Sequence, residues 1–247
     1  MAFGHCESNG HSEGAMAELS EKVVQKTTGI TLDDIRRDPE VEAYVNKANE
    51  YTGAIGYTEH GTRHATLTAN IAYNTLKRLG HPERDAQLAA VAAYMHDIGN
   101  LVSRVNHEHT GAVLANRILE RLGVDPVERA IIMGAIGNHE ERGGEPVSPV
   151  GAAVILADKS DVHRSRVRNP DPTTFDIHDR VNNAVEHSFL RVDEKNKRII
   201  LELTIDTKLS QVMEYFEIFL TRMVMCRRAA QFLSCEFKLH INGAKLL

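Results

Sequence analysis

The chain has 247 residues, of which 42% are hydrophobic and 26% are charged, a composition typical of a soluble globular protein with one or two domains. Its net charge of −5 argues against general affinity for nucleic acid or for anionic membranes, so any polyanion site must be local. It contains no apolar run long enough to span a bilayer and three cysteines without CxxC spacing, so we expect a cytoplasmic protein with no membrane partner.

The N-terminal region is rich in Gly, Ser, His and Glu over roughly its first fifteen residues, which we expect to be mobile. Helices are expected from Ala15 to about Gln25 and from about Asp38 to Tyr51. The segment Thr31-Leu-Asp-Asp is typical of a capped helix start. Residues 1–50 are therefore interpreted as an N-terminal flexible segment with helices, ahead of a main domain at 51–185.

The middle of the chain reads as a run of helices with clear ends. Glycines or a proline mark most of these ends, and the region is expected to be all helix, which predicts a mainly α fold. The expected helices are Gly61–Leu79, a helix that starts near Pro82 and is closed by Gly99, and residues 107–122, 126–141 and 148–163.

The character of the sequence changes after about residue 186. A β-hairpin, one long amphipathic helix over 209–233 and a closing strand are expected, so residues 186–247 form a small C-terminal α+β (ββαβ-like) module. The apolar seam of the helix allows two interpretations: a coiled-coil homodimer, or burial against its own hairpin and the helical domain. We favour burial, because the helix is apolar nearly all round.

Several helices carry an inward-facing His or Asp near one end, on an otherwise apolar face. Each alone is more often a hydrogen-bonded core residue than a ligand. Together they would be costly to desolvate without a cation, because imidazole and carboxylate groups then lack compensation for lost water. The inward-facing residues are His60 or His64, His96, Asp97, His107, His139 and Asp158.

At these residues the chain resembles a known family. The order His64, then His96-Asp97, then Asp158 is similar to the H…HD…D signature of the HD superfamily of metal-dependent phosphohydrolases, and His-Asp-Ile-Gly is its HDIG variant. The resemblance covers about residues 58–170 and implies an HD-type helical bundle. It makes His64, His96, Asp97 and Asp158 ligands of one metal, with Asp97 bridging to a second ion on His107 and His139.

The resemblance also implies substrate contacts and one or two divalent transition-metal ions, with Fe, Mn, Zn, Co and Ni all compatible. His60 fits the first-ligand position almost as well as His64 and is otherwise an outer or phosphate contact. Arg63, Lys159 and Arg164 are the expected substrate-binding cations, and Lys159 and Arg164 join Asp97 as expected catalytic residues. Asn100 replaces a Lys that often follows HDIG, and no Gly-Tyr-Pro follows His139.

The sequence therefore predicts a metal-dependent phosphohydrolase, either a phosphomonoesterase or a phosphodiesterase. It would cleave a small phosphorylated metabolite, a nucleotide being favoured, with metal-activated hydroxide. The alternative is a sensor that binds a phosphorylated ligand and holds its metals for structure only. A homodimer through the C-terminal module is compatible with both functions.

Overall fold

The structure is a computed structural model and describes residue 1 and residues 29–246. The expected helix at Ala15–Gln25, the expected mobility at the N-terminus and Cys6 lie outside the described residues. The described chain begins with α2 (Leu32–Arg36), where Thr31 and Asp34 form the expected capping box. α3 (Pro39–Ala54) follows, and Asp38 caps it by accepting from two backbone N–H groups.

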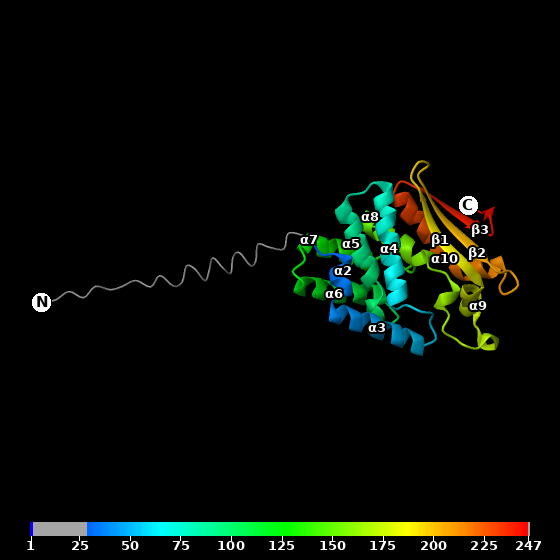
Figure 1. The fold of residues 1–247 in the computed structure, drawn as a ribbon, viewed down its shortest axis with the longest axis horizontal. Coiled ribbons are helices and arrows are strands. Elements are labelled where there is room, and N and C mark those ends of the chain that lie inside the picture. The colour runs from blue at the N-terminus through cyan, green and yellow to red at the C-terminus, as the bar shows by residue number, and fades with distance from the viewer. Residues whose placement is uncertain (2–28, 247) are drawn as a thin grey trace.

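A bundle of helices forms the body of the molecule, and α5 lies at its centre between α4, α7 and α8 (Figure 1). From Leu88 to Met95, α5 is buried on every side, and the alanines among these residues let the neighbouring helices approach closely. The other helices pack around this axis with an aliphatic core. The bounds are α4 (Thr62–Leu79), α5 (Glu83–Met95), α6 (His107–Arg121), α7 (Pro126–Gly137) and α8 (Pro149–Ser160).

Two helix ends differ from the sequence prediction. α5 ends at Met95, so the prediction that Gly99 closes it is wrong; Gly99 lies instead in a 3-10 turn, η1 (Ile98–Leu101). The backbone of α6 passes so close to Gly99 that a Cβ there would overlap the His107 carbonyl oxygen. α7 likewise ends at Gly137 rather than near residue 141, and Asn138 turns its side-chain amide back to the Gly134 carbonyl.

The C-terminal region is a sheet packed on one long helix. The short helix α9 (Ile177–Ala184), which the sequence did not predict, precedes the sheet. β1 (Val185–Asp193) and β2 (Arg198–Ile205) form the expected antiparallel hairpin, and α10 (Val212–Phe232) returns the chain. β3 (Glu236–Ile241) then pairs parallel to β2, and a short β4 (Ala244–Lys245) completes the order β1-β2-β3-β4. The predicted mainly α fold with a small α+β module is thus confirmed.

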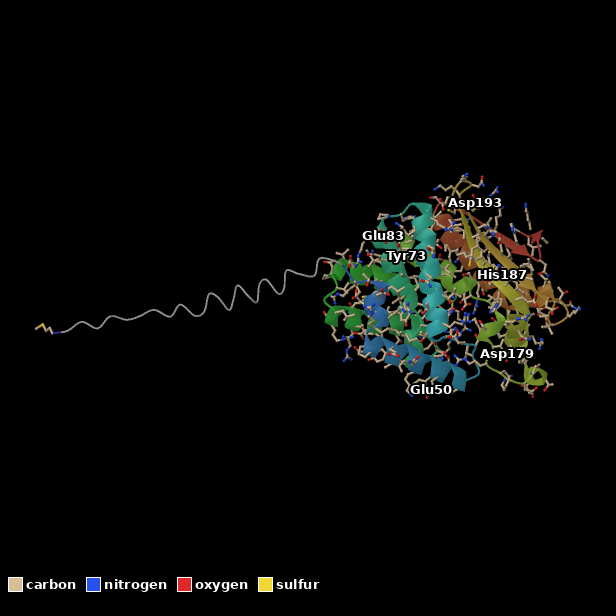
Figure 2. All side chains as sticks on the ribbon, in the orientation of Figure 1. Glu50, Tyr73, Glu83, Asp179, His187 and Asp193 are labelled. Carbon is tan, nitrogen blue, oxygen red and sulfur yellow. The ribbon has the colours of Figure 1, made fainter. Side chains whose placement is uncertain are left out.

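The side chains that cover the molecule are largely polar (Figure 2). Tyr73 of α4 and Glu83, the first residue of α5, lie beside each other there, and the phenol donates to the carboxylate at 2.8 Å. Asp193 ends β1 and accepts from the backbone of Asn196 in the hairpin turn. No helix within the described residues is both long and apolar enough to cross a membrane.

α10 buries most of its apolar side chains against α8 and β3, among them Tyr215, Phe219 and Cys226. Burial within the chain therefore accounts for most of the apolar seam. Met213 and Leu220 stay exposed on the outer side of the helix. A homodimer through this module and the division of the chain at residues 50 and 185 both stay predictions.

Candidate metal centre

The His-Asp pair stands where the central helix gives way to a turn. His96 is the C-cap of α5 and Asp97 precedes η1, so both leave the alanine-rich core at the same end of the bundle. Both residues are buried, at 1% and 8% exposure. The fold therefore directs an imidazole and a carboxylate into a space that the ends of α6, α7 and α8 also reach.

Four side chains from α4, the end of α5 and α8 meet in a first group. His64 Nε2 lies 3.3 Å from His96 Nε2, 3.4 Å from Asp158 Oδ1 and 3.6 Å from Asp97 Oδ2. His96 Nε2 lies 3.3 Å from Asp97 Oδ2 and 3.6 Å from Asp158 Oδ1. Such closely set donor atoms on separate helices could hold a metal ion.

A second group shares Asp97 with the first. The other oxygen of Asp97, Oδ1, lies 3.3 Å from His107 Nε2 and 4.0 Å from His139 Nε2. The two Nε2 atoms are 3.1 Å apart, and Glu140 Oε2 lies 3.7 Å from His107 Nε2. The two oxygens of Asp97 thus face different groups, as a bridging carboxylate requires.

All four imidazoles use Nδ1 to bind the protein, which leaves Nε2 for the cluster. Each partner oxygen can only accept, so Nδ1 must carry a proton, and Nε2 is the nitrogen left to offer a lone pair to a metal ion. This arrangement is typical of metal-binding histidines, whose far nitrogen donates to a carbonyl or carboxylate. The acceptors are Asp161 Oδ2 for His64 at 2.7 Å, the Ala93 carbonyl for His96 at 2.7 Å, the Arg104 carbonyl for His107 at 3.1 Å and the Ile136 carbonyl for His139 at 2.7 Å.

The cluster holds two ionised carboxylates in a buried space. Burial raises the pKa of Asp97 and Asp158, but nearby imidazoles, and Lys159 for Asp158, hold both values well below the usual range. Burial opposes protonation of His96, yet Asp97 and Asp158 outweigh it and raise its pKa to about 10. Burial depresses the pKa of His139. Metal binding would replace the proton on His96, because a ligating imidazole must be neutral.

One atom of the cluster lacks the partner that burial demands. Asp97 Oδ2 is buried and accepts no hydrogen bond in the described residues, although an ionised carboxylate so placed needs compensation. The other oxygen of the same carboxylate, Asp97 Oδ1, accepts a hydrogen bond from Asn100 Nδ2 at 3.0 Å. Asn100, which stands where the family often has Lys, therefore fixes the orientation of Asp97. The donor set and the unsatisfied Oδ2 both fit a divalent transition metal.

The expected substrate cations are already occupied by carboxylates. Lys159 is buried, with Nζ 2.8 Å from Asp158 Oδ2 and 3.2 Å from Glu141 Oε1. Arg164 pairs with Glu186 at 3.0 Å and its side chain is 42% exposed, so it lies outside the buried cluster. The structure thus places neither cation as a free phosphate contact.

Arg63 and His60 lie beside the first group without entering it. Arg63 pairs with Glu59 at 2.9 Å and with Asp161 at 2.8 Å. His60 Nδ1 contacts the Thr58 carbonyl at 2.6 Å. Burial lowers the pKa of His60 well below its ordinary value, so the ring is neutral. Its centre lies 5.6 Å from the His64 ring, and the atoms that meet Asp97 and Asp158 belong to His64.

Sequence reasoning missed three residues that adjoin the cluster. Asp161 binds the far side of His64, Glu141 binds Lys159, and Arg104 places Nη1 3.1 Å from His107 Nε2. Arg104 also lies over the ring of Tyr57, 5.1 Å from its centre. The sequence signal was weak, because each residue sits in an ordinary charged stretch.

Comparisons with known proteins identify a family domain in this part of the chain. Residues 61–163 match the model of the HD domain family. An uncharacterized protein of Methanocaldococcus jannaschii, MJ1020, is 28% identical over 206 residues, which cover 74% of this chain and 79% of that protein. The crystal structure of a predicted HD superfamily hydrolase from an uncultured Thermotogales bacterium is 25% identical, covers 54% of this chain and 75% of its own, and superimposes with a TM-score of 0.41.

Residues 61–163 therefore contain an HD domain, and the sequence resemblance to the HD superfamily is confirmed. All six residues expected as ligands lie in this segment. This domain supports a metal-dependent hydrolase. Arg104, Glu141 and Asp161 also lie within the HD domain, whereas α10 lies outside it.

Proposed function

We propose that the protein is a metal-dependent phosphohydrolase that cleaves a phosphoester of a small phosphorylated metabolite, with nucleotides as its substrate class. The carrying observation is the convergence of four Nε2 atoms and two carboxylates, with every Nδ1 held by the protein. A site built only for stability would not need an unsatisfied carboxylate oxygen at its centre. The nucleotide part of the proposal rests on the family resemblance.

In this proposal His64, His96, Asp97 and Asp158 hold one ion, and Asp97 is shared with a second ion on His107 and His139. Bound ions there would lower the pKa of a water molecule and neutralise charge on phosphoryl oxygens. Asn100 keeps Asp97 turned so that its oxygens face the two groups. Burial of the cluster excludes bulk water, which strengthens each electrostatic contact inside.

Arg104 supplies the positive charge that the transition state of phosphoryl transfer needs. Its side chain is 23% exposed and its guanidinium adjoins His107, so Arg104 reaches both the cluster and solvent. Glu140 holds it at 3.4 Å, and the Lys159 and Arg104 charges help to lower the pKa of Glu140 to about 2 against the effect of burial. A bidentate guanidinium at this position suits a phosphoryl group.

The test combines metal analysis with a substrate panel. The wild-type protein is loaded with Mn²⁺, Co²⁺ or Zn²⁺ and assayed for phosphate release from nucleotides and from p-nitrophenyl mono- and diesters. Asp97→Ala should abolish both activity and metal content, and His64→Ala should abolish the first ion while His60→Ala keeps it. Stable metal binding without hydrolysis of any substrate would favour the sensor function instead.

A further inference from the structure

α10 brings one arginine from outside the HD domain to the edge of the cluster. Arg222 lies near the middle of this helix, and its Nε is 3.1 Å from Glu141 Oε1. Its guanidinium carbon lies 4.6 Å from the ring centre of Phe219, and the side chain is only 24% exposed. The contact joins the C-terminal module to the turn that follows His139.

Glu141 Oε1 is shared with a second cation. Lys159 Nζ lies 3.2 Å from the same oxygen and 2.8 Å from Asp158 Oδ2. Both contacts to Glu141 Oε1 fall outside hydrogen-bond geometry, so charge alone compensates this buried atom. Positive and negative groups therefore alternate from Arg222 to Asp158. Asp158 Oδ2 faces Lys159, while Asp158 Oδ1 faces His64 and His96.

We propose that Arg222 is a positioning residue for the metal centre, acting on Asp158 through Glu141 and Lys159. This inference rests on the proposed function, because it assumes that Asp158 binds an ion. Without Arg222, Lys159 alone must balance Glu141, and the ammonium is drawn away from Asp158 Oδ2. The carboxylate is then free to adopt a second orientation in which Oδ1 no longer faces His64.

Through the contact of Arg222 with Glu141, the C-terminal module has a role in the chemistry of the HD domain. A purely structural role for Arg222 would change the thermal stability of the protein and leave the affinity of the metal site unaltered. A positioning role changes metal affinity even in a folded protein, since outer contacts of metal ligands typically affect affinity or activity about 10- to 100-fold.

The same helix offers a matched control. Arg228 forms a similar ion pair between α10 and the segment before α8, with Glu145 at 2.6 Å, but both side chains are more than half exposed. An exposed pair of this kind contributes little. Arg228→Gln therefore makes the same chemical change on the same helix. It leaves the ion pairs that connect Arg222 with Glu141, Lys159 and Asp158 unchanged.

The experiment titrates the full-length, metal-free protein with Co²⁺ and follows its visible absorption, with melting temperatures measured in parallel. Arg222→Gln should weaken the first ion roughly 10-fold, Arg222→Lys should restore most of the affinity, and Arg228→Gln should match the wild type. Wild-type affinity in a folded Arg222→Gln protein, with binding lost in Asp158→Ala, would overturn the positioning role alone. Wild-type protein that binds no Co²⁺ would overturn the metal centre and this role together.

Discussion

Asp161 Oδ2 accepts a hydrogen bond from His64 Nδ1 at 2.7 Å, and this contact fixes which nitrogen of His64 faces the cluster. The same carboxylate binds Arg63 at 2.8 Å and lies in the turn after α8. Nearby Arg166, together with His64, holds the pKa of Asp161 well below its usual range although burial opposes this. Asp161 is therefore ionised and orients an imidazole that the proposed function uses as a ligand.

The first prediction concerns Asp161→Asn. The amide accepts more weakly from Nδ1–H, removes the carboxylate beside Arg166 and leaves Arg63 with Glu59 alone, so His64 loses its fixed orientation. We expect metal affinity at the first group to fall about 10- to 100-fold, measured by Co²⁺ titration. Asp33→Asn makes the same change at an exposed carboxylate and should leave affinity at the wild-type value. Equal affinities in the two variants would contradict the role of Asp161.

A second prediction concerns Gly99 of the His-Asp-Ile-Gly segment. A Cβ at this position would overlap backbone atoms of His107 and Gly111, neither of which can move without shifting α6. Because α6 carries His107, Gly99→Ala should lower the free energy of unfolding by at least about 1–3 kcal/mol and weaken the second metal group. Urea unfolding and metal stoichiometry measure the two effects.

Gly134 provides the control for that change. It lies inside α7, and the nearest atom to an added Cβ would be Val147 Cγ2 at 3.7 Å, an ordinary contact. Gly134→Ala should therefore raise the free energy of unfolding by about 0.5–1 kcal/mol through helix propensity. Destabilisation of similar size in both variants would show that close approach of α6 is not what requires Gly99.

The sequence alone was sufficient to predict the inward direction of residues that share an apolar face of their helix. His64, His107 and Asp158 each lie near one end of a helix and share a face with small or aliphatic residues, so periodicity predicted that they point inward. The requirement for glycine at residue 99 was not predictable, since it arises from the close approach of the α6 backbone rather than from local preference.

The residues that surround the ligands were harder to find for a different reason. Their roles depend on which charged groups meet across the fold, and one sequence does not show such pairs. Lys159 and Arg164 lie in the same basic stretch, yet one is buried beside Asp158 and the other pairs with Glu186 in solvent. Arg104 and Arg222 likewise gain their positions only from tertiary packing.

A third prediction separates Arg104 from Arg164 as the phosphate contact. If Arg104 binds the phosphoryl group, Arg104→Met should raise KM or lower kcat/KM about 10- to 100-fold, as expected for a lost charged hydrogen bond. The same change should tighten binding of the second ion, because a positive charge beside His107 is removed. Steady-state kinetics with p-nitrophenyl phosphate and Co²⁺ titration measure both effects.

Arg164→Met and Arg78→Met complete this comparison. Arg78 forms a surface pair with Glu194 at 3.8 Å, so its loss should leave kinetics and metal binding as in the wild type. A larger kinetic defect in Arg164→Met than in Arg104→Met would support the sequence prediction for Arg164 and contradict the proposed role of Arg104.

The last prediction concerns stability at low pH and a carboxylate far from the cluster. Asp38 caps α3 and binds Arg121 Nη2 at 2.8 Å. Burial raises the pKa of Asp38, but the Arg121 contact and the backbone N–H groups outweigh it and lower the pKa below 3.8. A depressed pKa means that the stabilisation is fully present above the unfolded pKa and is lost as pH falls through the folded pKa.

Asp38→Asn should thus cost about 0.5–1 kcal/mol at pH 7 and progressively less below about pH 4. Asp125→Asn, at the matching cap of α7, should have a small effect throughout. Urea unfolding at pH 7, 4.5 and 3 measures the difference, and a constant gap between wild type and Asp38→Asn would contradict the assignment.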